Sequence, residues 1–175
     1  MIATLRGKLR RKLEDRVVVE SSGVGYEVFL PPVALRTISQ AVASGGDAAS
    51  EVPLVIYYHA TRDQPRPVLI GFTSELEKEF FEKLITVKDI GPLVAARALT
   101  CSVAEFADAI ARQDEKFLRR LPGIGPQKAK NIMAQLQAKV AKFALLKQTA
   151  PTTEPAPPAA AGDAGLRELV WEVLV

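Results

Sequence analysis

Cysteine, histidine and tryptophan are nearly absent from this chain, which has one of each among 175 residues. A single cysteine, Cys101, excludes a disulfide framework and a cysteine-based zinc cluster. With His59 as the one histidine, a catalytic triad or a histidine metal site is improbable, so we expect no metal and no cofactor. No apolar run approaches the roughly 20 residues of a transmembrane helix, and the first residues do not resemble a signal peptide. We therefore expect a cytoplasmic protein without membrane contact.

The net charge is small, at +3, but it is unevenly distributed along the chain. Residues 1–150 carry a net charge of +6, and residues 151–175 carry −3. A basic body with a separable acidic tail points to a polyanionic partner. Charge alone fits a scattered, solvated surface equally well.

Residues 1–72 show the period-two alternation and the turn residues of short strands. Pro31 and Pro32 are expected to end the third strand, because proline cannot donate a hydrogen bond to a neighbouring strand. The expected strands are Ile2–Leu9, Arg16–Glu20, Val24–Leu30, Pro53–Ala60 and Val68–Phe72, with loops over Ala41–Ser50 and Thr61–Pro67. Five short strands predict a small closed barrel of the OB-fold type, since closure hides the strand edges.

After Phe72 the apolar spacing becomes helical, which predicts an all-α domain over residues 73–148. Ser74 with Glu77, and Ser102 with Glu105, have the spacing of capping boxes, and Asp114 is expected to cap a short helix. The final long helix is expected to begin near Pro126. The apolar positions expected to face inward are Leu76, Phe80, Phe81, Leu84, Ile85, Phe106, Ala109, Ile110, Phe117, Leu118, Ile132, Met133, Leu136 and Val140.

The end of the chain has a different composition. Residues 149–165 are rich in proline and alanine, which is typical of an extended linker. Residues 166–175 have one amphipathic helical face, but an isolated helix of this length is marginal in water. This segment must dock on another surface to be stable.

The most specific motif is the segment Leu121-Pro122-Gly123-Ile124-Gly125-Pro126-Gln127-Lys128-Ala129. A Gly-apolar-Gly turn that leads directly into a helix exposes backbone N–H groups, and these groups with the helix dipole bind anions. The pattern is that of a helix-hairpin-helix motif, which holds DNA phosphates without reading bases. The residues predicted to contribute to this phosphate site are Gly123, Ile124, Gly125, Gln127, Lys128 and Lys130.

A second copy of the motif lies 34 residues earlier, where Ile90-Gly91-Pro92 precedes Ala95. One such turn alone could be a structural corner between helices, but two aligned copies are hard to explain by packing. The earlier copy is weaker, because Asp89 replaces the first glycine and Leu93 carries no charge. Its predicted phosphate-binding residues are Lys88, Ile90 and Gly91.

A five-stranded barrel followed by tandem helix-hairpin-helix motifs resembles the RuvA family. The resemblance extends from residue 1 to about residue 147 and rests on three further segments besides the hairpins: Met1-Ile2 through Leu5-Arg6-Gly7, Gly23-Val24-Gly25-Tyr26-Glu27-Val28, and Leu69-Ile70-Gly71-Phe72. It implies a homotetramer, with an octamer as the alternative, that binds a four-way DNA junction independently of sequence. It also implies a RuvB-type motor and a RuvC-type resolvase as partners.

The resemblance assigns roles to two further regions. Asp63 corresponds to the acidic pin that such proteins project toward the junction centre, although here it is a single carboxylate between Arg62 and Arg66. Residues 166–175 correspond to the start of the domain that engages the motor, or to a remnant of it. The residues that would dock there are Leu166, Leu169, Val170 and Trp171.

Helix-hairpin-helix motifs also occur in glycosylases and ligases, but this chain has no aspartate at the glycosylase position, no recognisable lysine nucleophile and no Walker-type loop. We therefore expect a subunit without enzymatic activity. The alternatives are an oligomer of the same fold that binds DNA but no longer supports motor-driven branch migration, and a helix-hairpin-helix accessory protein of DNA repair.

Overall fold

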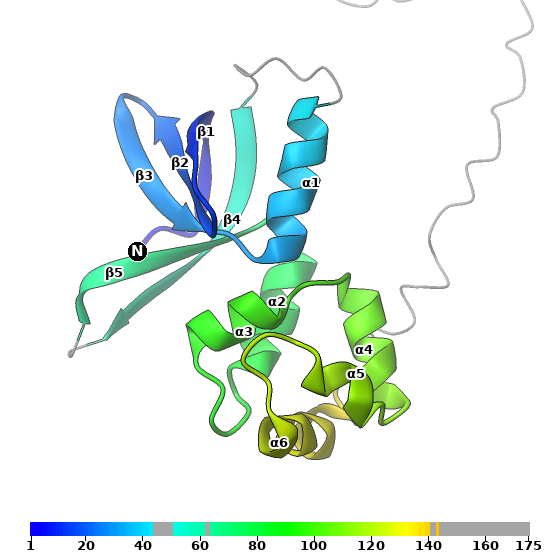
Figure 1. Ribbon diagram of the computed structural model, residues 1–175. Coiled ribbons are helices and arrows are strands. Elements are labelled where there is room, and N and C mark those ends of the chain that lie inside the picture. Colours follow the sequence, from blue (N-terminus) through cyan, green and yellow to red (C-terminus); the bar gives the residue numbers. More distant parts are fainter. Residues whose placement is uncertain (44–50, 62–63, 141–142, 144–175) are drawn as a thin grey trace, which may run out of the picture.

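The computed structural model describes residues 1–43, 51–61, 64–140 and 143, and it contains a β-barrel followed by a helical domain (Figure 1). The predicted fold class is confirmed. The barrel strands are β1 (Thr4–Lys12), β2 (Arg16–Ser21), β3 (Val24–Phe29), β4 (Glu51–Thr61) and β5 (Gln64–Phe72). The helices are α1 (Pro32–Ala43), α2 (Glu75–Leu84), α3 (Pro92–Ala98), α4 (Val103–Ala111), α5 (Glu115–Arg119) and α6 (Pro126–Leu136).

The barrel closes in the order β1-β2-β3-β5-β4. All strand pairs are antiparallel except β3 with β5, which run parallel through Val28–Phe29 and Leu69–Ile70. A parallel pair needs a long connection, and here α1 and β4 supply it. The strands β4 and β5 also extend away from the barrel as a two-stranded ribbon (Figure 1).

Alternating side chains fill the barrel, as the period-two pattern predicts. On β2, Val17 and Val19 are buried and Val18 between them is only half-buried. Gly7 is required where it stands, because a Cβ atom there would lie 2.1 Å from the Glu20 carbonyl oxygen. The buried hydrophobic residues of this core are Leu5, Val17, Val19, Val28, Leu30, Ile38, Leu54, Ile56 and Leu69.

Helix α1 is absent from the sequence-based prediction. Its buried Ala34 and Ile38 are spaced four residues apart and lie on one face. Pro32 occupies the first helical position, where a missing N–H has no cost, so the proline pair ends β3 and also starts a helix. The predicted loop over Ala41–Ser50 is wrong in its first three residues, which belong to α1, and its remaining residues lie outside the described part of the chain.

The predicted Thr61–Pro67 loop is also too long. Thr61 belongs to β4 and pairs with Gln64, and β5 already begins at Gln64. Pro65 and Pro67 lie within this strand although proline usually interrupts sheets. Prolines therefore mislead a sequence-based reading in both the barrel's ribbon and α1.

The helices of the helical domain differ in how completely their N-termini are capped. Ser102 and Glu105 form the predicted reciprocal capping box, and Asp114 accepts a hydrogen bond from the Phe117 N–H at 2.9 Å. At α2 the prediction is half correct. The Ser74 side chain accepts from the Glu77 N–H, but the Glu77 carboxylate accepts from the N–H of Thr73 at 2.8 Å instead of that of Ser74.

One prediction about the apolar helix faces is wrong, and the prediction that Val140 faces inward is confirmed. Leu76 lies one turn before the buried Phe80 of α2 but is 37% exposed, so the buried face of this helix begins only at Phe80. Helix α6 ends at Leu136, and Val140 is buried beyond it in a turn. The apolar spacing thus continues past the end of the regular helix.

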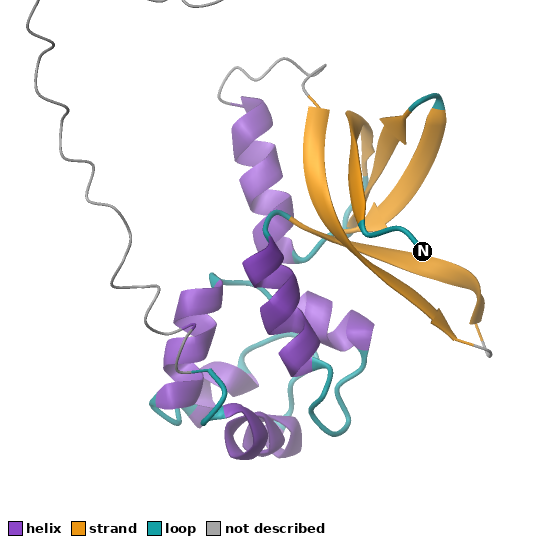
Figure 2. Ribbon diagram, turned by 180° about the vertical axis from the view of Figure 1, so that it is seen from behind, coloured by secondary structure: helices purple, strands orange, loops and turns teal. Residues whose placement is uncertain are grey.

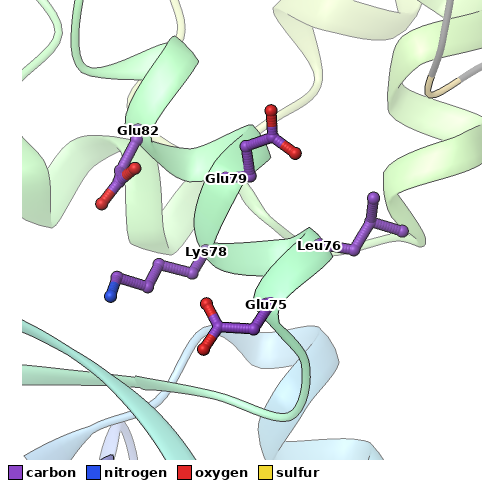
Figure 3. Close-up of a pocket in the computed structure, with 5 residues that line it drawn as sticks. All are labelled: Glu75, Leu76, Lys78, Glu79 and Glu82. Carbon is purple, nitrogen blue, oxygen red and sulfur yellow. The ribbon is translucent and has the colours of Figure 1, made fainter. Parts of the chain in front are cut away.

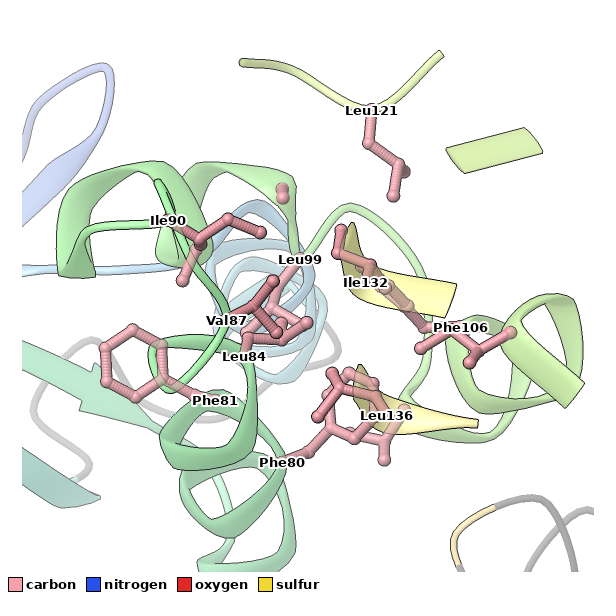
Figure 4. Close-up of a cluster of buried hydrophobic side chains, with 14 of the residues drawn as sticks. Phe80, Phe81, Leu84, Val87, Ile90, Leu99, Phe106, Leu121, Ile132 and Leu136 are labelled. Carbon is pink, nitrogen blue, oxygen red and sulfur yellow. The ribbon is translucent and has the colours of Figure 1, made fainter. Parts of the chain in front are cut away.

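One hydrophobic core joins the barrel to the helices. Figure 4 shows the part of this core that the helical domain contributes. Phe29, Ile70 and Phe72 of the barrel are buried in the same cluster as the helical side chains. The Phe81 ring lies 4.9 Å from that of Phe72 and 5.0 Å from that of Tyr57, measured between centroids. The shared core fixes the barrel and the helical domain relative to each other.

The described residues contain no helix that is long and apolar enough to cross a membrane. The last barrel strand ends at Phe72, and α2 starts at Glu75. The predicted linker and the segment 166–175 lie outside the described residues.

Candidate nucleic-acid interface

Two turns with the same backbone geometry precede α3 and α6. The residue before each helix is a glycine in extended conformation, with φ −83° at Gly91 and −86° at Gly125, and each helix has a proline in its first turn. In both copies the carbonyl of that glycine accepts a hydrogen bond at 2.9 Å, from the N–H of Ala95 or Ala129. The repeat seen in the sequence is therefore a repeat in structure.

The residue two positions before each glycine is left-handed. Its φ is +75° at Gly123 and +67° at Asp89. Few side chains tolerate this conformation, but glycine does and aspartate is among the exceptions. The substitution of Asp89 for glycine thus preserves the turn.

The isoleucine between these two positions holds the turn together. Ile90 and Ile124 are 5% and 4% exposed, and their N–H groups donate to the carbonyls of Val87 and Leu121 at 3.2 and 3.1 Å. Their N–H groups are thereby engaged within the turns. Any contact of these two residues with phosphate stays a prediction.

The second turn presents open backbone to solvent. A Cβ atom at Gly125 would meet nothing within 4 Å, so nothing in the described protein blocks an approaching ligand. Because α6 begins at Pro126, the N–H groups of Gln127 and Lys128 have no intrahelical acceptor. Such donors at a helix N-terminus, aligned with the helix dipole, bind anions.

Cationic side chains surround this open backbone. The Lys128 ammonium donates a hydrogen bond to the Gly123 carbonyl at 3.1 Å, which holds the charge over the turn. Lys130 is exposed, and the exposed Gln127 donates to the Asn131 side chain at 3.3 Å. The structure thus brings Lys128 onto Gly123 beside Gly125 and Gln127, whereas Lys130 is only shown to be exposed in the same helix.

The first turn has the same backbone but less charge. Gly91 is as open as Gly125, and Lys88 is exposed. The positions equivalent to Gln127 and Lys128 are Leu93 and Val94, which carry no charge. This copy therefore offers backbone donors with little cationic support.

The two turns are neighbours. A Cβ atom on Gly123 would lie 3.2 Å from the Val94 side chain of α3, so the second turn lies against the first helix of the repeat. Between the turns and the barrel lie contacts that the sequence analysis missed. Arg97 of α3 pairs with Asp15 at 3.8 Å and lies 5.9 Å over the Phe29 ring, and Arg36 of α1 donates to the Thr100 carbonyl.

The pKa shifts of two groups between the barrel and the helical domain have simple causes. The hydrogen bond from Arg16 lowers the pKa of Asp15, with a smaller contribution from Arg97. Burial raises the pKa of the Cys101 thiol to about 11, which makes a thiolate nucleophile improbable at neutral pH. Within the described residues no group of three or more histidine, cysteine, aspartate or glutamate residues could hold a metal ion.

A second surface feature has the opposite charge. Helix α2 lines an open depression of about 490 Å³ with Glu75, Leu76, Lys78, Glu79 and Glu82 (Figure 3). Three carboxylates and one ammonium give this surface a net negative charge, which disfavours DNA. The surface formed by the helix N-termini of the two hairpins is therefore the better candidate for a polyanion-binding site.

Two groups of predicted site residues are not placed. Asp63, the predicted pin, lies outside the described residues. The predicted docking residues Leu166, Leu169, Val170 and Trp171 also lie outside them.

Comparison with known proteins covers both parts of the fold. The family model of the RuvA N terminal domain matches residues 1–66, and that of the SAM-like helix-hairpin-helix tandem matches residues 81–138. The Holliday junction branch migration complex subunit RuvA of Desulfatibacillum aliphaticivorans is 46% identical over 145 residues, which are 82% of this chain and 68% of that protein. The protein of the same description from Desulfosudis oleivorans is 42% identical over 82% of this chain and 68% of its own length. That of Ruminiclostridium cellulolyticum is 34% identical over 100% of this chain and 83% of its own length.

Proposed function

This chain belongs to the RuvA family of Holliday junction branch migration complex subunits, and on that premise we propose that it binds four-way DNA junctions with its paired hairpins. The observation that carries the proposal is the repeated turn, in which two open glycine backbones precede two helix N-termini. Each turn offers N–H donors to a phosphate. Because phosphates are the same at every base pair, the binding is independent of sequence.

The two hairpins contribute unequally. Gly125 leaves room for the phosphate, Gly123 permits the turn, and Gln127, Lys128 and Lys130 supply donors and charge. Ile124 supports the turn through its buried side chain. In the first hairpin Gly91 leaves room for the phosphate, Lys88 supplies charge and Ile90 supports the turn. This hairpin has less positive charge than the second.

Assembly supplies the four-fold geometry of a junction. We propose a homotetramer, with an octamer as the alternative, in which the shared core holds each hairpin pair at a fixed position relative to its barrel. The subunit itself catalyses nothing, and ATP hydrolysis would belong to a RuvB-type motor, with a RuvC-type resolvase as a further partner. Asp63 at the junction centre and docking through Leu166, Leu169, Val170 and Trp171 belong to the same proposal.

A mobility-shift assay tests the binding. The protein is titrated onto a four-way junction and onto a linear duplex of the same arm sequence, at several stated salt concentrations. We expect a strong preference for the junction and a linear fall of log affinity with log salt, because binding releases counterions. Equally weak binding to both substrates contradicts the proposal.

A second candidate function is favoured by Asp89, because it places a negative charge in one hairpin of the pair. The chain would then bind junctions as a structural oligomer without supporting motor-driven branch migration. Adding a RuvB-type motor and ATP to the bound junction separates the two. Migration that depends on this subunit supports the first function, and stable binding without migration supports the second.

A further inference from the structure

At Asp89 the two hairpin turns differ in charge but not in backbone conformation. The left-handed φ of +67° at Asp89 matches the +75° of Gly123, and the hydrogen bonds that follow are the same in both copies. The Asp89 residue is exposed. The first turn thus has the backbone of the second turn, with a carboxylate in addition.

The charge of Asp89 is not neutralised by an ion pair within the described residues, where none of the pairs within 4.0 Å involves it. The first hairpin also lacks the two lysines of the second, since Val94 and Ala96 stand at the positions equivalent to Lys128 and Lys130. Lys88 and Asp89 together leave the first turn with no net charge, whereas Lys128 and Lys130 give the second +2.

The two copies of the repeat are in contact. Gly123 lies against Val94, so the turn of the second copy lies next to the helix of the first.

We propose that Asp89 weakens the DNA grip of the paired hairpins and sets how readily a bound duplex arm is released. This inference rests on the proposed function. The carboxylate repels the phosphates that approach Gly91 and cancels the positive charge of Lys88 in the same turn. Weaker phosphate contacts would let a bound duplex arm dissociate or shift along the subunit faster, which branch migration requires.

Asp89→Asn tests the proposal, because asparagine has the same shape, tolerates the left-handed conformation and lacks the charge. We expect junction and duplex affinity to rise about three-fold at low salt, the effect of one charge roughly 7 Å from a phosphate in water. The gain is expected mainly in a slower dissociation rate, and it should shrink as salt shortens the screening length.

Glu14→Gln is the matched control, since it makes the same change in net charge at an exposed position in the β1–β2 turn. Circular dichroism and thermal unfolding confirm that both variants are folded. A rise in affinity for Asp89→Asn that exceeds that of Glu14→Gln supports the inference. Equal affinities of the two variants, or a loss for Asp89→Asn, overturn it while leaving the proposed function intact. Failure of the unaltered chain to bind junctions is the distinct result that overturns the proposed function.

Discussion

At Gly125 a Cβ atom would meet nothing in the described protein, and we expect this open space to admit a phosphate. Gly125→Ala therefore leaves the fold intact but places a methyl group where a phosphate must approach. We expect junction affinity to fall about ten-fold, the effect of losing one charge-assisted hydrogen bond. The measurement is the junction mobility shift at fixed salt.

Gly91→Ala is the matched variant, because Gly91 has the same conformation and the same open space. Both variants lose the same N-cap preference, up to about 1 kcal/mol of stability. A smaller loss of affinity is expected at Gly91, since its hairpin has less positive charge. A larger loss at Gly91 would reverse the ranking of the two hairpins.

Sequence reasoning located the hairpin residues because the motif is local. A turn, a glycine and the first helical residues are adjacent in the chain, so their spacing determines their geometry. The contacts of Arg97 and Arg36 were not predicted, because they are not local. Their partners Asp15 and Thr100 are more than 60 residues distant in the sequence, and no pattern along one segment reports such a contact.

At the scale of single elements, the capping box of α4 is a clear stabilising feature. The Ser102 N–H donates to the Glu105 carboxylate at 3.1 Å, and the Glu105 N–H donates to the Ser102 hydroxyl at 3.2 Å. We expect Ser102→Ala to lower the free energy of unfolding by about 1 kcal/mol, as for other N-caps. Urea denaturation measures this change.

Ser74→Ala is the comparison at α2, where only one of the two reciprocal bonds is present. Its loss of stability should be smaller than that of Ser102→Ala, because the Ser102 hydroxyl also donates a hydrogen bond to the Glu105 carboxylate at 3.0 Å. An equal or greater loss for Ser74→Ala would mean that this hydroxyl–carboxylate bond adds nothing to the stability of α4.

The elements themselves were predictable to different degrees. Strands and capped helices follow from alternation and from Ser-x-x-Glu spacing, which are properties of the segment. Helix α1 was missed because Pro31-Pro32 was interpreted only as the end of a strand, although proline suits a first helical turn equally well. The parallel pairing of β3 with β5 depends on where the chain returns, and that information is not local.

At the scale of the whole molecule, Arg97 connects the helical domain to the barrel through Asp15 and Phe29. An exposed ion pair of this kind contributes at most about 1 kcal/mol, so Arg97→Ala should barely change the midpoint of thermal unfolding. We expect it to reduce the preference for junction over duplex several-fold, because the hairpins would be held less firmly relative to the barrel.

The readout for Arg97→Ala is the ratio of the two affinities, which a general loss of folded protein leaves unchanged. Arg112→Ala serves as the control, since its pairing with Asp108 lies within one helical turn and joins no domains. An unchanged ratio for Arg97→Ala would show that the shared hydrophobic core alone positions the hairpins.

The parallel pairing of β3 with β5 also constrains how the protein is made. During synthesis β2 is available to pair with β3 as soon as both have emerged, but the other edge of β3, at Val28 and Phe29, has no native partner until Leu69 and Ile70 have left the ribosome. For the time needed to translate about 40 further residues, the nascent chain displays an open strand edge that other chains can join. Barrel closure is therefore a late event of biogenesis, and the elongation rate between β3 and β5 sets how long a newborn subunit is exposed to misassembly.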